Sequence, residues 1–474
     1  MADAASTARE YSAVTFGGRS DTCYGLEVVC HHLAGLGWKR IPFNPRGAET
    51  ILVSLFWPEQ LYDLVRWRKR YGITDRKIIA GGNCVTANPA AVLPFVSACY
   101  LGDGELWDGS NDSPYLVSRE RPGPARPAVA PHITPVAYED HQVTKRTFCE
   151  ISRGCRRKCL FCQYTWLKPY REVDPADIRE ILLRRRTRMV RIFAADRFQH
   201  TVYPRVRRWI EELGGQDSGS DVSVDYALRH PEYLRVTHKA RSGIEGMSYR
   251  LRRMVGKPYT DDQLCHYVEL LVAHGIRCID WYVIYGLPTE SDADADAFID
   301  LLARFERIFA PVPNPVLAIH WNAFEPNPVT PFQWEGAAYG YPRARMQRIF
   351  EARFSYRVLH EPKMTSDRRM AARMLAVRSG PDQARLLYNV ALHPGVWLKD
   401  PDRLCARFER EAGYPLCGAV TPGTPMPWDR HVVYPAGRFV AIRNAAIEGA
   451  IRRAGAPEQR TSGTVSLPVL CACG

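Results

Sequence analysis

Two hydrophobic periods alternate along the first hundred residues. Short apolar runs of strand length end at glycine or polar residues, and each is followed by a longer stretch in which apolar residues recur every three to four positions. Strands that alternate with helices predict a parallel, doubly wound α/β sheet. The predicted strands are 12–16, 39–43, 50–56 and 77–80, and the predicted helices are 22–36 and 59–71.

Residues 108–144 break this pattern. The stretch contains six prolines, at positions 114, 122, 124, 127, 131 and 135. Proline removes a backbone donor and clashes inside a helix, so the stretch cannot sustain one. We therefore predict a linker between a first domain, residues 11–107, and a second domain, residues 145–335.

The second domain repeats a β/α unit. Its clearest helix start is Asp174, an N-cap residue followed by Pro175, which opens a predicted helix to residue 186. The other predicted helices are 203–213, 261–274 and 292–309, and the predicted strands are 189–194, 221–226, 233–236, 278–284 and 316–321. The last third of the chain, 336–474, predicts two helices, 346–360 and 366–376, and a strand, 388–392.

Composition narrows the class of protein. The 474 residues are 46% hydrophobic and carry a net charge of +13. No window approaches the roughly 18 consecutive apolar residues of a membrane span, and the first ten residues lack the apolar core of a signal peptide. We expect a soluble, cytoplasmic protein with no membrane partner.

The positive charge has two interpretations. Arginines concentrate at 184–188 and 205–208, which can attract a phosphate backbone or can simply form solvated helix faces. No dedicated nucleic-acid module is recognisable, so nucleic acid stays open as a substrate class.

The strongest chemical signal is a group of three cysteines, Cys155, Cys159 and Cys162, within eight residues. Three thiolates on one tight loop can hold three irons of a [4Fe–4S] cube and leave the fourth iron open to another ligand. A zinc site is the alternative, but zinc normally takes ligands from two paired elements, and the chain has no second C-x2-C pair. Fourteen dispersed cysteines also favour reduced thiols and a metal site over disulfides.

This spacing, with Phe161 before the third cysteine, resembles the C-x3-C-x-aromatic-C signature of the radical S-adenosylmethionine (radical SAM) superfamily. Further stretches resemble its barrel motifs, namely 243–248, 254–260, 284–290 and 324–331. The resemblance covers 145–335 firmly and 11–107 loosely. It implies a partial (β/α)6 barrel, with 336–474 as a mixed α/β extension that closes its open side.

The resemblance also implies the cofactors and their contacts. S-adenosylmethionine would bind the open iron, and an electron from a flavodoxin- or ferredoxin-type donor would cleave it to a 5′-deoxyadenosyl radical. Its binding residues would be Phe161, Asp196, Glu245, Arg250, Ile284 and Gly286. Asp196 belongs to Ala194-Ala195-Asp196, which replaces the family's usual G-G-E.

The first domain resembles the cobalamin-binding domains that precede many radical SAM barrels. Glycines at strand ends let a backbone approach a bulky cofactor, so Gly81, Gly82, Gly102 and Gly104 either line a corrin face or form the turns that any such sheet needs. The Asp-x-His-x-x-Gly signature for an axial histidine is absent, although relatives without it exist.

Two functions remain open at this stage. The leading hypothesis is a cobalamin-dependent radical SAM methyltransferase that acts on an unactivated carbon. The alternative is a radical SAM enzyme that modifies tRNA or DNA without cobalamin, and a structural iron–sulfur or zinc protein is the non-enzymatic limit. Four further cysteines either bind a second cluster or are ordinary thiols: Cys405, Cys417, Cys471 and Cys473.

Overall fold

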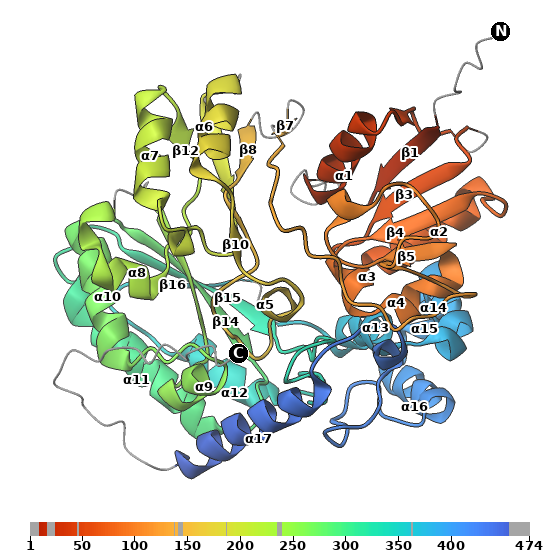
Figure 1. Cartoon of the computed structure of the whole chain (residues 1–474). Coiled ribbons are helices and arrows are strands. Elements are labelled where there is room, and N and C mark those ends of the chain that lie inside the picture. Colours follow the sequence, from red (N-terminus) through yellow and green to blue (C-terminus); the bar gives the residue numbers. More distant parts are fainter. Residues whose placement is uncertain are drawn as a thin grey trace, which may run out of the picture.

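The computed structural model describes residues 9–16, 24–44, 47–136, 138–140, 146–185, 187–234, 239–361 and 364–454. Its elements form two α/β units, drawn in red to orange and in yellow to cyan in Figure 1, with the last helices in blue. The mixed α/β class and the parallel sheets predicted from the sequence are confirmed. Cys23, Cys471 and Cys473 lie outside the described residues.

The first unit is a six-stranded sheet of order β2-β1-β3-β4-β5-β6, parallel except for the edge strand β6. The predicted strands and both predicted helices of this unit are present, with bounds shifted by a few residues. The strands are β1 (Glu10–Thr15), β2 (Lys39–Arg40), β3 (Thr50–Ser54), β4 (Lys77–Gly81), β5 (Ala98–Tyr100) and β6 (Leu116–Ser118). The helices are α1 (Tyr24–Gly35), α2 (Gln60–Tyr71), α3 (Asn83–Ala87) and α4 (Pro89–Val92). β6 comes from the stretch that the sequence assigned to the linker.

Helices cover both faces of this sheet. On one face Leu52 packs in a cluster with Leu26 of α1, and on the other Ile51 packs in a cluster with Leu61 of α2. Successive strand residues point to opposite faces, so the continuous apolar run of β3 is buried on both sides, as in doubly wound sheets.

The second unit is a curved, mostly parallel sheet in two sections, β12-β11-β8-β7 and β13-β14-β15-β16. A bridge between Asp221 and Arg241 joins them, so β8, β11, β12, β13, β14 and β15 follow one another as the six strands of a partial barrel. The strands are β7 (Tyr138–Asp140), β8 (Arg146–Glu150), β11 (Met189–Phe193), β12 (Gln216–Asp217), β13 (Lys239–Glu245), β14 (Cys278–Tyr285), β15 (Val316–Ala323) and β16 (Arg357–Glu361), with the short pair β9 (Ser152–Arg153) and β10 (Arg171–Glu172).

Most helices of this unit cover the outer face of the barrel, whereas the short helix at 163–167 packs against α3 of the first unit. The predicted N-cap is present, since the Asp174 side chain accepts a hydrogen bond from the Ala176 amide at 2.7 Å. The helices are α5 (Gln163–Leu167), α6 (Pro175–Arg184), α7 (Tyr203–Glu212), α8 (Val224–Arg229), α9 (Tyr249–Met254), α10 (Asp261–Ala273), α11 (Asp292–Phe309) and α12 (Arg343–Glu351).

Four predicted elements differ in the structure. The predicted strand 221–226 is wrong: only Asp221 bridges to the sheet, and α8 begins at Val224. The predicted strand 233–236 overlaps a 3-10 turn that ends at Tyr233, and its last two residues lie outside the described part. The predicted helix 346–360 ends at Glu351, because residues from Arg357 instead pair with β15. The predicted strand 388–392 is the end of helix α14.

The C-terminal helices are α13 (Asp367–Arg378), α14 (Ala384–Leu392), α15 (Pro394–Trp397), α16 (Pro401–Ala412) and α17 (Ala436–Arg452). They bind the first unit as well as the barrel. The Tyr62 hydroxyl on α2 donates to the Ala372 carbonyl at 2.6 Å, and the Asn88 side chain donates to the carbonyls of Val377 and Ser379. α14 packs on α2, while α17 runs beside α9 of the barrel.

Candidate active site and cofactor pocket

The three cysteines lie on one loop, which we call the cluster loop. It follows β8 and β9 and ends where α5 begins. Hydrogen bonds fix this loop: the Cys162 amide donates to the Cys159 carbonyl at 3.2 Å, and the Trp166 indole donates to the same carbonyl at 2.9 Å. The Leu160 amide donates to the Val255 carbonyl at 3.2 Å. The loop is therefore attached to the segment after β13 as well as to its own helix.

Cys159 is buried and the other two thiols are partly exposed. Burial raises the pKa of Cys159 to about 12 and also raises the pKa of Cys162. Among the described residues, no three acidic, histidine or cysteine side chains converge as ligands of a single metal ion. A [4Fe–4S] cube presents a separate iron to each thiolate, so three cysteines on one loop still fit that cluster.

Gly256 lies directly against the cluster loop. Its backbone has φ +88°, and a Cβ there would lie 3.0 Å from the Lys158 carbonyl oxygen and 3.3 Å from Cys159 Cα. Only glycine adopts this conformation easily and leaves the space free. Gly256 begins the G-K-P-Y segment, residues 256–259, and therefore sets how closely this segment approaches the cluster loop.

Lys257 follows this glycine and is held by β13. Its Nζ lies 2.7 Å from Glu245 Oε1 and 2.8 Å from the Gly243 carbonyl oxygen. Burial alone would lower the pKa of Lys257, but the negative charges of Glu245, Cys159 and Tyr259 together outweigh burial and the pKa is raised. Lys257 also lowers the pKa of Cys159 against the effect of burial, so Glu245, Lys257 and the cluster loop form one electrostatic group.

Asp196 also lies beside this loop, but its carboxylate is occupied. Asp196 Oδ2 contacts Arg157 of the loop at 3.3 Å and Gln199 Nε2 at 3.2 Å. Gln199 Nε2 in turn lies 3.4 Å from Cys155 Sγ, and Arg157 also binds Asp225. The structure thus brings Asp196 to the cluster loop as a partner of Arg157.

Arg250 holds the turn after β14. Its guanidinium binds Asp294 on α11 and donates to the Thr289 carbonyl at 2.8 Å. Gly286 in that turn has φ +75°, and its amide donates to Glu290 Oε2 at 2.9 Å. Arg250 therefore orients the G-L-P-T-E turn, residues 286–290.

Ile284 and Phe161 are largely apolar contacts at the same end of the barrel. Ile284 is buried near the end of β14, opposite Asn322 of β15. Phe161 is partly buried against the main core cluster, and its carbonyl oxygen accepts a hydrogen bond from Asn327 at 3.4 Å. Both belong to the carboxyl ends of the barrel strands or the loops beside them.

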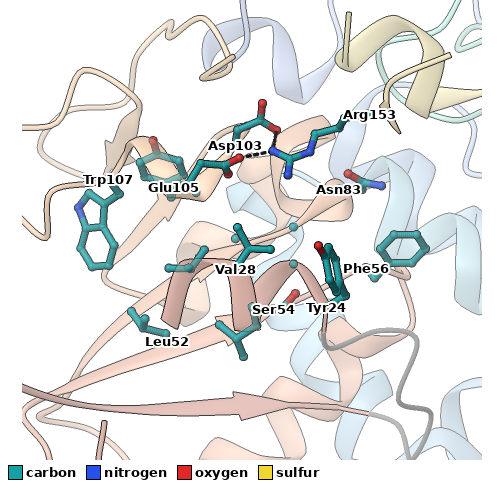
Figure 2. A pocket seen from close by; sticks show the side chains of 18 of the residues that line it. Tyr24, Val28, Leu52, Ser54, Phe56, Asn83, Asp103, Glu105, Trp107 and Arg153 are labelled. Carbon is teal, nitrogen blue, oxygen red and sulfur yellow. Dashed lines mark hydrogen bonds and ion pairs between the residues drawn. The ribbon is translucent and has the colours of Figure 1, made fainter. Parts of the chain in front are cut away.

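A pocket of about 1020 Å³, including space open to solvent, lies between the two units (Figure 2). The first sheet contributes the carboxyl ends of β3, β4 and β5, and α1 covers them with Tyr24 and Val28. The barrel contributes five residues: Glu150, Arg153, Tyr164, Lys168 and Phe193. No histidine lines the pocket among the described residues, which agrees with the missing Asp-x-His-x-x-Gly signature.

All four glycines singled out from the sequence line this pocket. Internal packing already requires three of them, because a Cβ on Gly82, Gly102 or Gly104 would overlap Leu55, Ala128 or Val29, respectively. A Cβ on Gly81 would meet only the Tyr100 carbonyl oxygen, at 3.9 Å. The sequence assigned these glycines either to a corrin face or to ordinary turns, and the structure gives three of them a packing role inside the fold.

A buried charge network forms one wall of the pocket and links the two units. Arg153, two residues before Cys155, contacts Glu150 at 2.9 Å and Asp103 at 3.2 Å and also binds Glu105. Asp103 further contacts Lys168 at 3.4 Å and Arg171 at 2.8 Å. Burial alone would raise the pKa of Asp103, but these cations outweigh it and lower the pKa to about 2.

Sequence reasoning missed several of these residues. Arg157 lies inside the cysteine motif and Lys257 inside the G-K-P-Y segment, so their position was a usable signal. Arg153 and Lys168 belong to no recognisable motif. Only their contacts with Asp103 of the first unit, which is distant in sequence, reveal them. Gln199 is likewise an ordinary surface-type residue until the loop folds against it.

The barrel segment matches a known protein family. Residues 149–302 match the sequence model of the Radical SAM superfamily, so the chain carries a radical SAM domain. An uncharacterized protein of Methanocaldococcus jannaschii is 21% identical over 348 residues, which cover 66% of this chain and 76% of that protein.

Two solved proteins were found as structural neighbours of this chain. The cobalamin-dependent S-adenosylmethionine radical enzyme OxsB is similar with a TM-score of 0.48 and 11% identity, over 95% of this chain and 80% of that one. Spore photoproduct lyase is similar with a TM-score of 0.27 and 10% identity, over 73% of this chain and 84% of that one.

Among the helices that the structure describes, none is both long and apolar enough to cross a membrane.

Proposed function

We propose that this protein is a radical SAM enzyme whose Cys155, Cys159 and Cys162 hold a [4Fe–4S] cluster. The observation that carries this proposal is the position of the three cysteines on one loop at the carboxyl end of β8, inside the segment that matches the superfamily. When bound, cluster and S-adenosylmethionine would supply a 5′-deoxyadenosyl radical after one-electron reduction by a flavodoxin- or ferredoxin-type donor.

The chain's own residues position these groups. Gly256 leaves room for the cluster loop, and Lys257 adds a positive charge beside Cys159 that favours the thiolate over the thiol. Asp196 and Glu245 are the proposed carboxylate contacts of S-adenosylmethionine, while Phe161, Ile284 and Gly286 supply apolar and backbone surface. Arg250 acts indirectly, because it orients the turn that contains Gly286.

The test compares two triple variants purified without oxygen. Replacing Cys155, Cys159 and Cys162 with alanine should remove the iron–sulfur absorption and the reductive cleavage of S-adenosylmethionine. The matched control replaces three cysteines outside the loop, Cys84, Cys265 and Cys278, and should retain both. Cleavage of S-adenosylmethionine by the first variant would contradict the proposal.

We further propose that the pocket between the two units binds cobalamin and that the reaction is methylation of an unactivated carbon. The support is the pocket's place at the carboxyl ends of β3, β4 and β5, where doubly wound sheets bind cofactors, and the wall it shares with the segment just before the cluster loop. Growth with cobalamin should give protein with a corrinoid absorption and about one cobalt per chain, because this pocket would hold one cobalamin.

A second candidate is modification of tRNA or DNA without cobalamin. The observation that favours it is the net charge of +13, because binding to phosphate backbones depends on such charge and weakens steeply with salt. Iron and 5′-deoxyadenosine without cobalt, together with salt-sensitive retention of RNA or DNA, would favour this candidate over the first.

A further inference from the structure

The inner face of the barrel carries a polar group that neither the cluster loop nor the pocket uses. Trp281 of β14 packs on Phe305 of α11, and Trp321 of β15 packs on Phe298 of the same helix. Neighbouring strand residues point to opposite faces. Asp280, which precedes Trp281, therefore faces the barrel interior.

Three basic side chains converge on one oxygen of this carboxylate. Asp280 Oδ2 lies 2.7 Å from Lys239 Nζ, 3.2 Å from Arg241 Nε and 3.2 Å from His320 Nε2. Asp280 itself is fully buried, whereas the side chains of Lys239 and Arg241 are 37% and 38% exposed. The basic groups thus cover the carboxylate and present their own surfaces to the interior.

The arrangement leaves binding capacity unused. Arg241 contacts Asp280 through Nε, and within the described part of the chain no hydrogen bond reaches its two terminal nitrogens. Those two nitrogens form the fork that binds carboxylate or phosphate oxygens in pairs. Asp280 fixes the direction of this fork and neutralises only one of the two permanent positive charges beside it.

An aromatic surface lies next to these cations. The rings of Tyr282 and His320 stack with centroids 4.8 Å apart and an interplanar angle of 20°. No described residue hydrogen bonds to the Tyr282 hydroxyl, so it too is available to a ligand. Tyr282 lies between Asp280 and Ile284 along the same face of β14.

We propose that Arg241 and Lys239, oriented by Asp280, bind an anionic group of the substrate, a carboxylate or a phosphate, inside the barrel. This inference rests on the proposed radical SAM function. At about 3.3 Å per strand residue, Asp280 lies roughly 13 Å along β14 from Ile284, where S-adenosylmethionine is expected. The substrate is therefore anchored at one end by its acidic group and extends toward the cofactor with the carbon that reacts.

Inorganic pyrophosphate serves as the probe, titrated calorimetrically into the full chain at moderate salt. The wild-type protein should bind it saturably, and Arg241→Gln should bind it about tenfold or more weakly, because one charge-assisted contact is worth about 1.5–3 kcal/mol. Arg241→Lys keeps the charge without the fork and should fall between the two. Arg348→Gln, at an exposed arginine on the outer helix α12, is the matched control and should bind as the wild type does.

The test separates this inference from the proposed function. The variant without the three loop cysteines should still bind pyrophosphate, since the anion site does not use the cluster. Absence of saturable binding to the wild type would overturn the inference. Equal weakening by Arg348→Gln and Arg241→Gln would also overturn it, because binding would then reflect overall charge.

Discussion

Arg153 donates hydrogen bonds to Glu150 from two nitrogen atoms, each 2.9 Å from a different carboxylate oxygen. Glu150 ends β8 and Arg153 lies two residues before Cys155, so this pair fixes the start of the cluster loop on the barrel. The same guanidinium also contacts Asp103 of the first unit at 3.2 Å. One side chain therefore joins the barrel, the first unit and the cluster loop.

Replacing Arg153 with methionine should destabilise the protein strongly. The change leaves Glu150 buried without its cation, and breaking a buried ion pair from one side costs about 3–5 kcal/mol. Urea unfolding, monitored by circular dichroism, measures this loss in the free energy of unfolding. The control, Arg184→Met, removes an exposed arginine paired with Glu180 and should cost less than about 1 kcal/mol. Equal losses of stability in the two variants would show that the network around Arg153 does not stabilise the fold.

Much of the fold was predictable from local pattern. The alternation of strands and helices identified most elements of the first sheet and of the barrel, because burial on one or both faces imposes a period on the sequence. The prediction failed for residues 388–392, whose apolar run is compatible with either a strand or a buried helix. Packing on α2 decides that it is a helix, and no local pattern contains this contact.

The site was predictable only as far as its motifs extend. The cysteines and the glycines of the pocket follow from short-range spacing. The partners of Asp196, Glu245 and Arg250 do not, because Arg157, Lys257 and Asp294 occupy them through contacts between separate elements. The sequence assigned these three side chains directly to S-adenosylmethionine, and the structure shows protein partners for all of them.

Glu325 should make stability depend on pH near neutrality. Burial raises its pKa to about 7, although Arg373, 2.8 Å away, acts in the opposite direction. The folded state therefore keeps a proton that the unfolded chain releases from about pH 4.5, so the free energy of unfolding falls as pH rises from there to about 7. At about 1.4 kcal/mol per pKa unit, the fall is at most about 3.5 kcal/mol.

Glu325→Gln tests this dependence, because glutamine does not titrate. The free energy of unfolding of the variant minus that of the wild type should therefore be larger at pH 8 than at pH 5. Urea unfolding at both pH values measures this difference. The exposed Glu361→Gln is the control and should show the same difference from the wild type at both values. A Glu325→Gln effect that is independent of pH would show that Glu325 does not titrate in this window.

Gly102→Ala should disrupt the pocket, while Gly81→Ala should be tolerated. Gly102 has φ +98°, and its added Cβ would overlap the Ala128 backbone, whereas a Cβ on Gly81 meets nothing closer than 3.9 Å. Strained backbone of this kind costs about 1–3 kcal/mol. Thermal unfolding should show a clear drop in the midpoint for Gly102→Ala only, and the reverse order would contradict the packing described here.

Gly256→Ala should impair the cluster loop more than it impairs the fold. Gly256 and Gly275 both have positive φ, +88° and +78°, but only a Cβ on Gly256 meets other atoms, namely the Lys158 carbonyl oxygen and Cys159 Cα. Backbone strain at a positive φ costs both variants a similar amount of stability, about 1–3 kcal/mol. Their difference therefore isolates the contact with the loop: iron content per chain after anaerobic reconstitution should fall for Gly256→Ala and stay near the wild-type value for Gly275→Ala. Equal iron in the two variants would show that the close approach of Gly256 is not needed to hold the three cysteines in place.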